Sequence, residues 1–121
     1  MERSDQIGRY GELLFVMEAI KRGFNVLYPD NVYGYDYVIE YESKFTRVQI
    51  KTTNSINENR RYIWNITNKS LGSDVFVFIV IDPRMFFMVR ENIIKQRKIV
   101  FAIPKKNIDN SYLNNWNIFK H

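Results

Sequence analysis

The apolar positions near the N-terminus recur at helical spacing, and they predict a helix over residues 5–22. These positions are Ile7, Tyr10, Leu13, Leu14, Met17 and Ile20. Ser4 or Asp5 can cap the beginning of this helix. Gly23 follows two basic residues, which is the usual signal for a helix end.

Shorter apolar or alternating runs follow, and they predict a series of strands. The runs cover residues 24–28, 35–41, 45–52, 61–67, 75–81, 85–89 and 99–103. The run 75–81 is apolar throughout, which is typical of a central strand, whereas 61–67 alternates and indicates one covered face. Short helices are expected at 91–96 and 109–116. This order predicts an α/β fold with a mixed sheet, built as one domain over residues 1–121.

Two neighbouring strands, 35–41 and 45–52, are expected to form a hairpin that gathers polar side chains. A two-residue turn at Ser43 and Lys44 sets the expected register. That register pairs Glu40 with Arg47, Val38 with Gln49, and Asp36 with Lys51. Because side chains alternate between faces, Asp36, Gln49 and Lys51 are expected together on one face, at the open end of the hairpin. Near the turn, Glu40 and Arg47 are expected to form an ion pair.

The three clustered side chains suit the hydrolysis of a phosphodiester. A hard cation such as Mg²⁺, or Mn²⁺ in its place, prefers oxygen ligands. Asp36 offers a carboxylate, Gln49 an amide oxygen and Ile50 a main-chain carbonyl. Lys51 can orient the attacking water, stabilise the transition state, or act as an acid or base.

Glu12 lies on the predicted N-terminal helix beside two glycines. Gly8 and Gly11 each cost the helix roughly 1 kcal/mol relative to alanine. A close approach of the helix to another backbone would explain that cost. Glu12 is therefore expected to reach the same metal cluster, directly or through water.

Composition restricts the chemistry further. The chain has 121 residues, no cysteine, and one histidine, His121. These counts exclude a disulfide, a catalytic thiol and a histidine-based zinc site or triad. The formal net charge of +5 favours a polyanionic partner. No apolar run approaches the roughly 20 residues of a membrane-spanning helix, so we expect a cytoplasmic protein, or one in the host cytoplasm if virus- or intron-encoded.

At these residues the sequence resembles the PD-(D/E)XK nuclease superfamily, which includes many restriction enzymes and archaeal Holliday-junction resolvases. The segments RGFNV, YDYVIE and RVQIKTT are most similar to homing endonucleases of this fold encoded in group I introns. In that subgroup a glutamine replaces an acidic residue, as Gln49 does here. The resemblance covers residues 8–53 well and the strands up to Val89 more loosely. It implies a restriction-endonuclease-like sheet flanked by helices and a metal-dependent DNA endonuclease, with Glu12, Asp36, Gln49 and Lys51 as catalytic residues.

Several alternatives stay open at this stage. Pro29 and Asp30 spell the PD motif, but Asp36 is favoured because it enters an apolar strand. The substrate is either duplex DNA with a specific sequence or a four-way junction. Cutting two strands needs two active sites, which predicts a homodimer or a higher oligomer. Because Gln49 removes one negative charge, a catalytically inactive DNA-binding module is the alternative function.

Overall fold

The computed structural model describes residues 4–29, 36–53, 61–65, 72–94, 100–104 and 111–120. Its elements are α1 (Ser4–Lys21), β1 (Asn25–Leu27), β2 (Tyr37–Tyr41), β3 (Lys44–Thr53), β4 (Arg61–Asn65), β5 (Val75–Val80), β6 (Met85–Arg90), α2 (Glu91–Ile94), β7 (Val100–Pro104) and the 3₁₀ helix η3 (Trp116–Phe119). The predicted N-terminal helix and all seven predicted strands are confirmed, as is the short helix α2. No described helix is long and apolar enough to cross a membrane.

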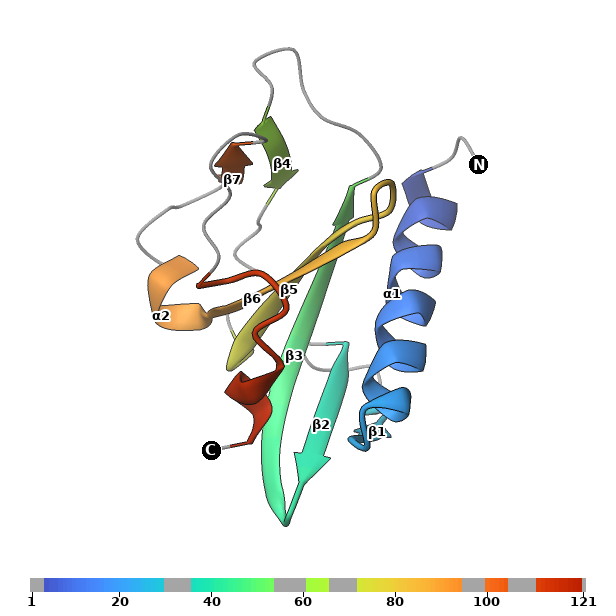
Figure 1. Cartoon of the computed structure of the whole chain (residues 1–121), viewed down its shortest axis with the longest axis vertical. Coiled ribbons are helices and arrows are strands. Elements are labelled where there is room, and N and C mark those ends of the chain that lie inside the picture. The colour runs from blue at the N-terminus through green and yellow to red at the C-terminus, as the bar shows by residue number, and fades with distance from the viewer. Residues whose placement is uncertain are drawn as a thin grey trace.

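The central sheet has five strands in the order β1-β2-β3-β5-β6. The β3–β5 pair is parallel and the other three pairs are antiparallel, so the sheet is mixed, as predicted. Strand β3 runs the length of this sheet, with α1 beside it (Figure 1). Strands β4 and β7 form a separate antiparallel pair.

Two apolar clusters cover the two faces of the central sheet. On one face, α1 and η3 pack against residues such as Ile39, Val48 and Val77. On the other face, Tyr62 and Trp64 of β4 pack against alternate residues of β5 and β6. Every residue of β5 is buried, as its apolar run predicts. The sheet therefore lies between two packed layers, which hold its strands in place.

The turn between β2 and β3 differs from the prediction. Glu42 and Ser43 have positive φ angles of 49° and 67°, so they form the turn in place of Ser43 and Lys44. The observed pairs include Glu40 with Phe45 and Val38 with Arg47, which is a shift of two residues. The predicted ion pair between Glu40 and Arg47 is therefore wrong. A shift of two residues preserves the face of every side chain, so the expected grouping on one face is unaffected.

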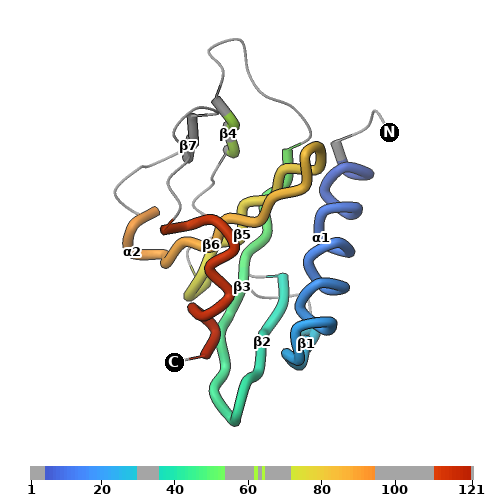
Figure 2. The backbone as a smooth tube through the Cα atoms, viewed as in Figure 1, coloured from blue at the N-terminus to red at the C-terminus, as the bar shows by residue number. Residues whose placement is uncertain are grey.

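Tertiary packing decides which side of α1 is buried, and it overturns the predicted helix at 109–116 within its described part. Helix α1 buries Leu14, Phe15, Val16 and Ala19 and turns Tyr10, Leu13, Met17 and Ile20 outward. Residues 111–115 do not form a helix, because this segment pairs with β6 and Asn114 has a positive φ of 52°. Figure 2 shows this C-terminal segment passing beside β6 before it enters η3.

Candidate active site

The candidate site lies where β2 begins, at the point beyond which β3 is paired with β5 but no longer with β2. The first residue of β2 is Tyr37, which pairs with Val48. Ile50 lies beyond this last pair, so its N–H has no partner within β2. The Asp36 carboxylate fills this position and accepts the Ile50 N–H at 2.8 Å. Because the N–H and C=O of one strand residue point to the same side, the Ile50 carbonyl faces the same edge. The Asp36 side chain is thus fixed at the edge of the sheet.

Gln49 and Lys51 complete the strand side of the site. The Gln49 amide nitrogen donates a hydrogen bond of 3.0 Å to the same Asp36 oxygen. Lys51 lies two residues further along β3 on the same face, and its charge acts on Asp36 by lowering the pKa of that carboxyl. The structure therefore brings the three predicted strand residues together. Asp30 lies outside the described residues.

Glu12 comes from the opposite face, because α1 packs on the other side of the sheet. Burial raises the pKa of the Glu12 carboxyl, and the negative charge of Asp36 raises it further, so the two carboxyl groups lie within electrostatic reach of each other. Gly11 allows this approach: a Cβ there would lie 2.8 Å from the Thr52 Cβ. The expected close approach thus holds at Gly11. At Gly8 it is wrong, because an added Cβ would meet nothing within 4 Å.

Tyr37 is a site residue that the sequence reasoning missed. Its ring belongs to the core, yet its hydroxyl donates a hydrogen bond of 2.9 Å to Glu12 Oε1. Arg9, one helical turn before Glu12, lies 3.4 Å from the same hydroxyl and 3.6 Å from Glu12 Oε1. In an alternating strand a tyrosine is indistinguishable from any other core aromatic. Its position directly after Asp36 was the available signal.

Burial dominates the electrostatics of both carboxyl groups. Desolvation raises the pKa of Asp36, against the lowering effects of the Ile50 N–H and the Lys51 charge. Desolvation also raises the pKa of Glu12, although the Tyr37 hydroxyl opposes this shift. Burial therefore disfavours the charged form of both carboxyl groups, and a bound cation would stabilise that form.

The donor set suits a hard divalent cation. Two carboxylates, one amide and one main-chain carbonyl supply only oxygen ligands, which is the preference of Mg²⁺ and Mn²⁺. The described part of the chain contains no group of three or more histidine, cysteine, aspartate or glutamate residues suited to a metal. Beside Asp36, Gln49 contributes an uncharged amide where a carboxylate would add a further negative charge.

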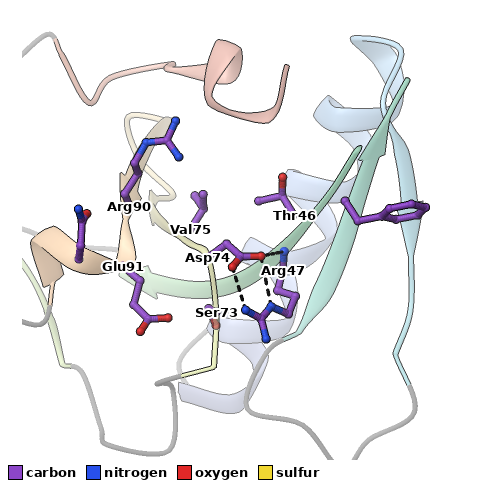
Figure 3. A pocket seen from close by; sticks show the side chains of 9 residues that line it. Thr46, Arg47, Ser73, Asp74, Val75, Arg90 and Glu91 are labelled. Carbon is purple, nitrogen blue, oxygen red and sulfur yellow. Dashed lines mark hydrogen bonds and ion pairs between the residues drawn. The ribbon is translucent and has the colours of Figure 1, made fainter. Parts of the chain in front are cut away.

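A second polar cluster lies at the other end of β3 and lines a pocket of about 530 Å³. There Asp74 accepts hydrogen bonds from the Arg47 backbone N–H at 2.8 Å and from its guanidinium at 2.9 and 3.2 Å (Figure 3). None of the predicted site residues lines this pocket. Its ion pair is the one that Arg47 forms in place of the predicted partner Glu40.

Known proteins share this fold. A model of the family described as PD-(D/E)XK endonuclease matches residues 2–117. The structure of a bacterial homing endonuclease, I-Ssp6803I, superposes with a TM-score of 0.86 at 19% identity, covering 99% of this chain and 94% of that chain. No curated protein matches. The similarity thus extends through the last thirty residues, beyond the range expected from the sequence, and the chain belongs to the PD-(D/E)XK endonuclease family.

Proposed function

We propose that this nuclease is a divalent-metal-dependent DNA endonuclease that uses Glu12, Asp36, Gln49 and Lys51. The observation that carries the proposal is the position of the Asp36 carboxylate. It is held at the edge of the sheet by Ile50 and Gln49, within electrostatic reach of both Glu12 and Lys51. Such a convergence of an acid, an amide and a cation, with a second acid from a helix, suits phosphodiester hydrolysis.

Each of these residues has a separate proposed role. Asp36, Glu12, the Gln49 amide oxygen and the Ile50 carbonyl would hold Mg²⁺ or Mn²⁺. When bound to such oxygens, the ion supplies an activated water and neutralises charge on the phosphate. Lys51 carries the only positive charge we assign to the reaction. It orients the attacking water or stabilises the charge that develops on the phosphate oxygens.

The proposed substrate is duplex DNA with a specific sequence. The bacterial neighbour is a homing endonuclease, which favours this choice over a four-way junction. The net charge of +5 suits either DNA. Incubation with plasmid and with synthetic four-way junctions separates the two, because a junction resolvase recognises the junction and ignores its sequence.

We further propose that the chain acts as a homodimer or a higher oligomer. Cleavage of both strands requires two sites, and a symmetric assembly supplies them. The outer face of α1 exposes Met17 and Ile20 by 66% and 60%, and an apolar face of this kind suits contact with a second copy. Sedimentation equilibrium measures the mass of the assembly directly.

Replacing Lys51 tests the activity. Lys51→Ala should reduce the rate of plasmid cleavage by at least about a hundredfold, because a preorganised charge at the reacting phosphate is lost. DNA affinity in Ca²⁺, measured by fluorescence anisotropy, should change little. Lys44→Ala, at the exposed turn end of the same strand, is the matched control and should cleave as the wild type does.

Unchanged cleavage by Lys51→Ala would defeat the assignment. Titration calorimetry with Mn²⁺ addresses the alternative of an inactive DNA-binding module. In that case the wild-type protein would bind DNA, take up no metal, and leave plasmid intact in Mg²⁺.

A further inference from the structure

Tyr37 joins the core of the protein to the candidate site through a single hydroxyl group. Its side chain is only 2% exposed, and its ring packs edge-on against Tyr28 at 5.1 Å. The ring therefore has little freedom to move. The hydroxyl at its tip is 2.9 Å from Glu12 Oε1, so a rigid element of the sheet holds a carboxylate of α1.

Arg9 fixes the direction of this hydrogen bond. A guanidinium has only donors, so the Tyr37 oxygen accepts from Arg9 Nη1 at 3.4 Å. The single hydroxyl proton is then directed to Glu12. A tyrosine hydroxyl is ordinarily protonated at neutral pH, so it has this proton to donate.

The two contacts leave one oxygen of Glu12 for another partner. Within the described part of the chain, both Tyr37 and Arg9 lie against Oε1. A helical glutamate otherwise samples many rotamers, and ordering it at the moment of metal binding costs conformational entropy. A carboxylate that is already held by one oxygen avoids much of that cost.

We propose that Tyr37 is a positioning residue that holds the Glu12 carboxylate so that its second oxygen, Oε2, faces the Asp36 cluster and receives the divalent cation. This inference rests on the proposed function of the site. Tyr37 touches neither the cation nor the DNA in this arrangement, and it acts only through Glu12. Partners of metal ligands that act in this way typically change metal affinity or activity by 10–100-fold when they are lost.

Tyr37→Phe tests the inference because it keeps the ring and removes the hydroxyl. Its affinity for Mn²⁺ without DNA, measured by titration calorimetry, should fall by about tenfold or more. The Mg²⁺ concentration for half-maximal plasmid cleavage should rise by a similar factor. Tyr41→Phe is the matched control, since Tyr41 lies on the same strand and the same face but packs against Phe24. It should bind Mn²⁺ as the wild type does.

A double-mutant cycle with Glu12→Gln separates positioning from a general structural effect. If Tyr37 acts through Glu12, Tyr37→Phe should cause no further loss of Mn²⁺ affinity in the Glu12→Gln background. Equal losses in both backgrounds would overturn the inference. Arg9→Lys provides a second variant that keeps the charge at an exposed position, and it should weaken Mn²⁺ binding by about threefold because the fork geometry is lost.

The outcomes distinguish this inference from the proposed function. If the wild-type protein binds Mn²⁺ and cuts DNA, and a folded Tyr37→Phe variant binds Mn²⁺ with the same affinity, the inference is overturned and the proposed function is not. If Tyr37→Phe does not fold, unchanged affinity in Arg9→Lys overturns it instead. A wild-type protein that neither binds Mn²⁺ nor cuts DNA overturns the proposed function, and the inference with it.

Discussion

Two clusters along β3 each combine an aspartate with a basic residue, but they satisfy the aspartate differently. Near the turn, Asp74 receives three hydrogen bonds from Arg47, two of them from the charged guanidinium. At the other end, the hydrogen bonds described for Asp36 come from uncharged donors on Ile50 and Gln49. The first carboxylate is neutralised within the fold. The second is partly buried and keeps a charge that an external cation can compensate, which is what distinguishes a binding site from a structural ion pair.

The largest expected difference between the Asp36 site and the Asp74–Arg47 ion pair is the pH dependence of metal binding. Because the pKa values of Asp36 and Glu12 are both raised, protons compete with the cation at a higher pH than at ordinary carboxylates. Mn²⁺ affinity should fall on acidification, by up to about a hundredfold per pH unit where both groups compete. Calorimetry over a pH series measures it.

The stability of the metal-free protein should show the corresponding sign. A carboxyl whose folded-state pKa is raised binds its proton more tightly in the folded chain than in the unfolded one. Unfolding free energy contributed by this pair should therefore decrease as the pH rises through the raised pKa values. Metal affinity that stays constant down to the ordinary carboxylate range would contradict this account.

Gln49→Glu should increase the difference between the two clusters, because it adds a third acid to the Asp36 site. The hydrogen bond to Asp36 is replaced by repulsion between like charges, which a cation relieves. At a pH above the raised pKa values, Mn²⁺ should bind about tenfold more tightly, because ligand charge tunes affinity at oxygen sites. Gln6→Glu adds the same charge at an exposed position of α1 and should leave affinity unchanged. No gain in Gln49→Glu would show that this side chain does not face the cation.

The two glycines of α1 test how the helix reaches the site. Gly11→Ala should destabilise the protein by about 1–3 kcal/mol, because the new methyl group overlaps Thr52 and pushes α1 away from β3. Gly8→Ala, with open space around its added Cβ, should instead stabilise it by about 0.5–1 kcal/mol. Chemical denaturation of both variants measures the difference. Similar values for the two would contradict the close approach at Gly11.

The smallest effect is expected at the turn end of β3. Arg47→Met removes an ion pair whose side chains are 50% and 42% exposed, so the loss of unfolding free energy should be at most about 1 kcal/mol. Mn²⁺ affinity and cleavage rate should match the wild type. A tenfold loss of cleavage would mean that this cluster contributes to function after all.

The grouping of Asp36, Gln49 and Lys51 could be predicted from the sequence even though the predicted register was wrong. Strand periodicity fixes the face of a side chain, and a register shifted by two residues does not change it. The turn itself was not predictable, because neither Glu42 nor Ser43 is a residue that favours a positive φ.

Long-range contacts account for the rest of what the sequence could not show. Arg47 finds Asp74 only because β3 and β5 pair in parallel, across 27 positions of the chain. The role of the Tyr37 hydroxyl depends on the docking of α1, which no local pattern contains. The same docking decides which apolar residues of the helix are buried, and it leaves Met17 and Ile20 outside.

The shortness of β2 has a consequence for how such a site could be gained or lost. The Asp36 carboxylate occupies a place that a backbone carbonyl would take if the ladder continued by two more pairs. An extension of β2 in the same register would therefore satisfy Ile50 with main-chain atoms and leave the carboxylate without its anchor. Strand length alone, with no change in any of the four polar side chains, would then decide whether this edge of the sheet is a reactive centre or ordinary scaffold.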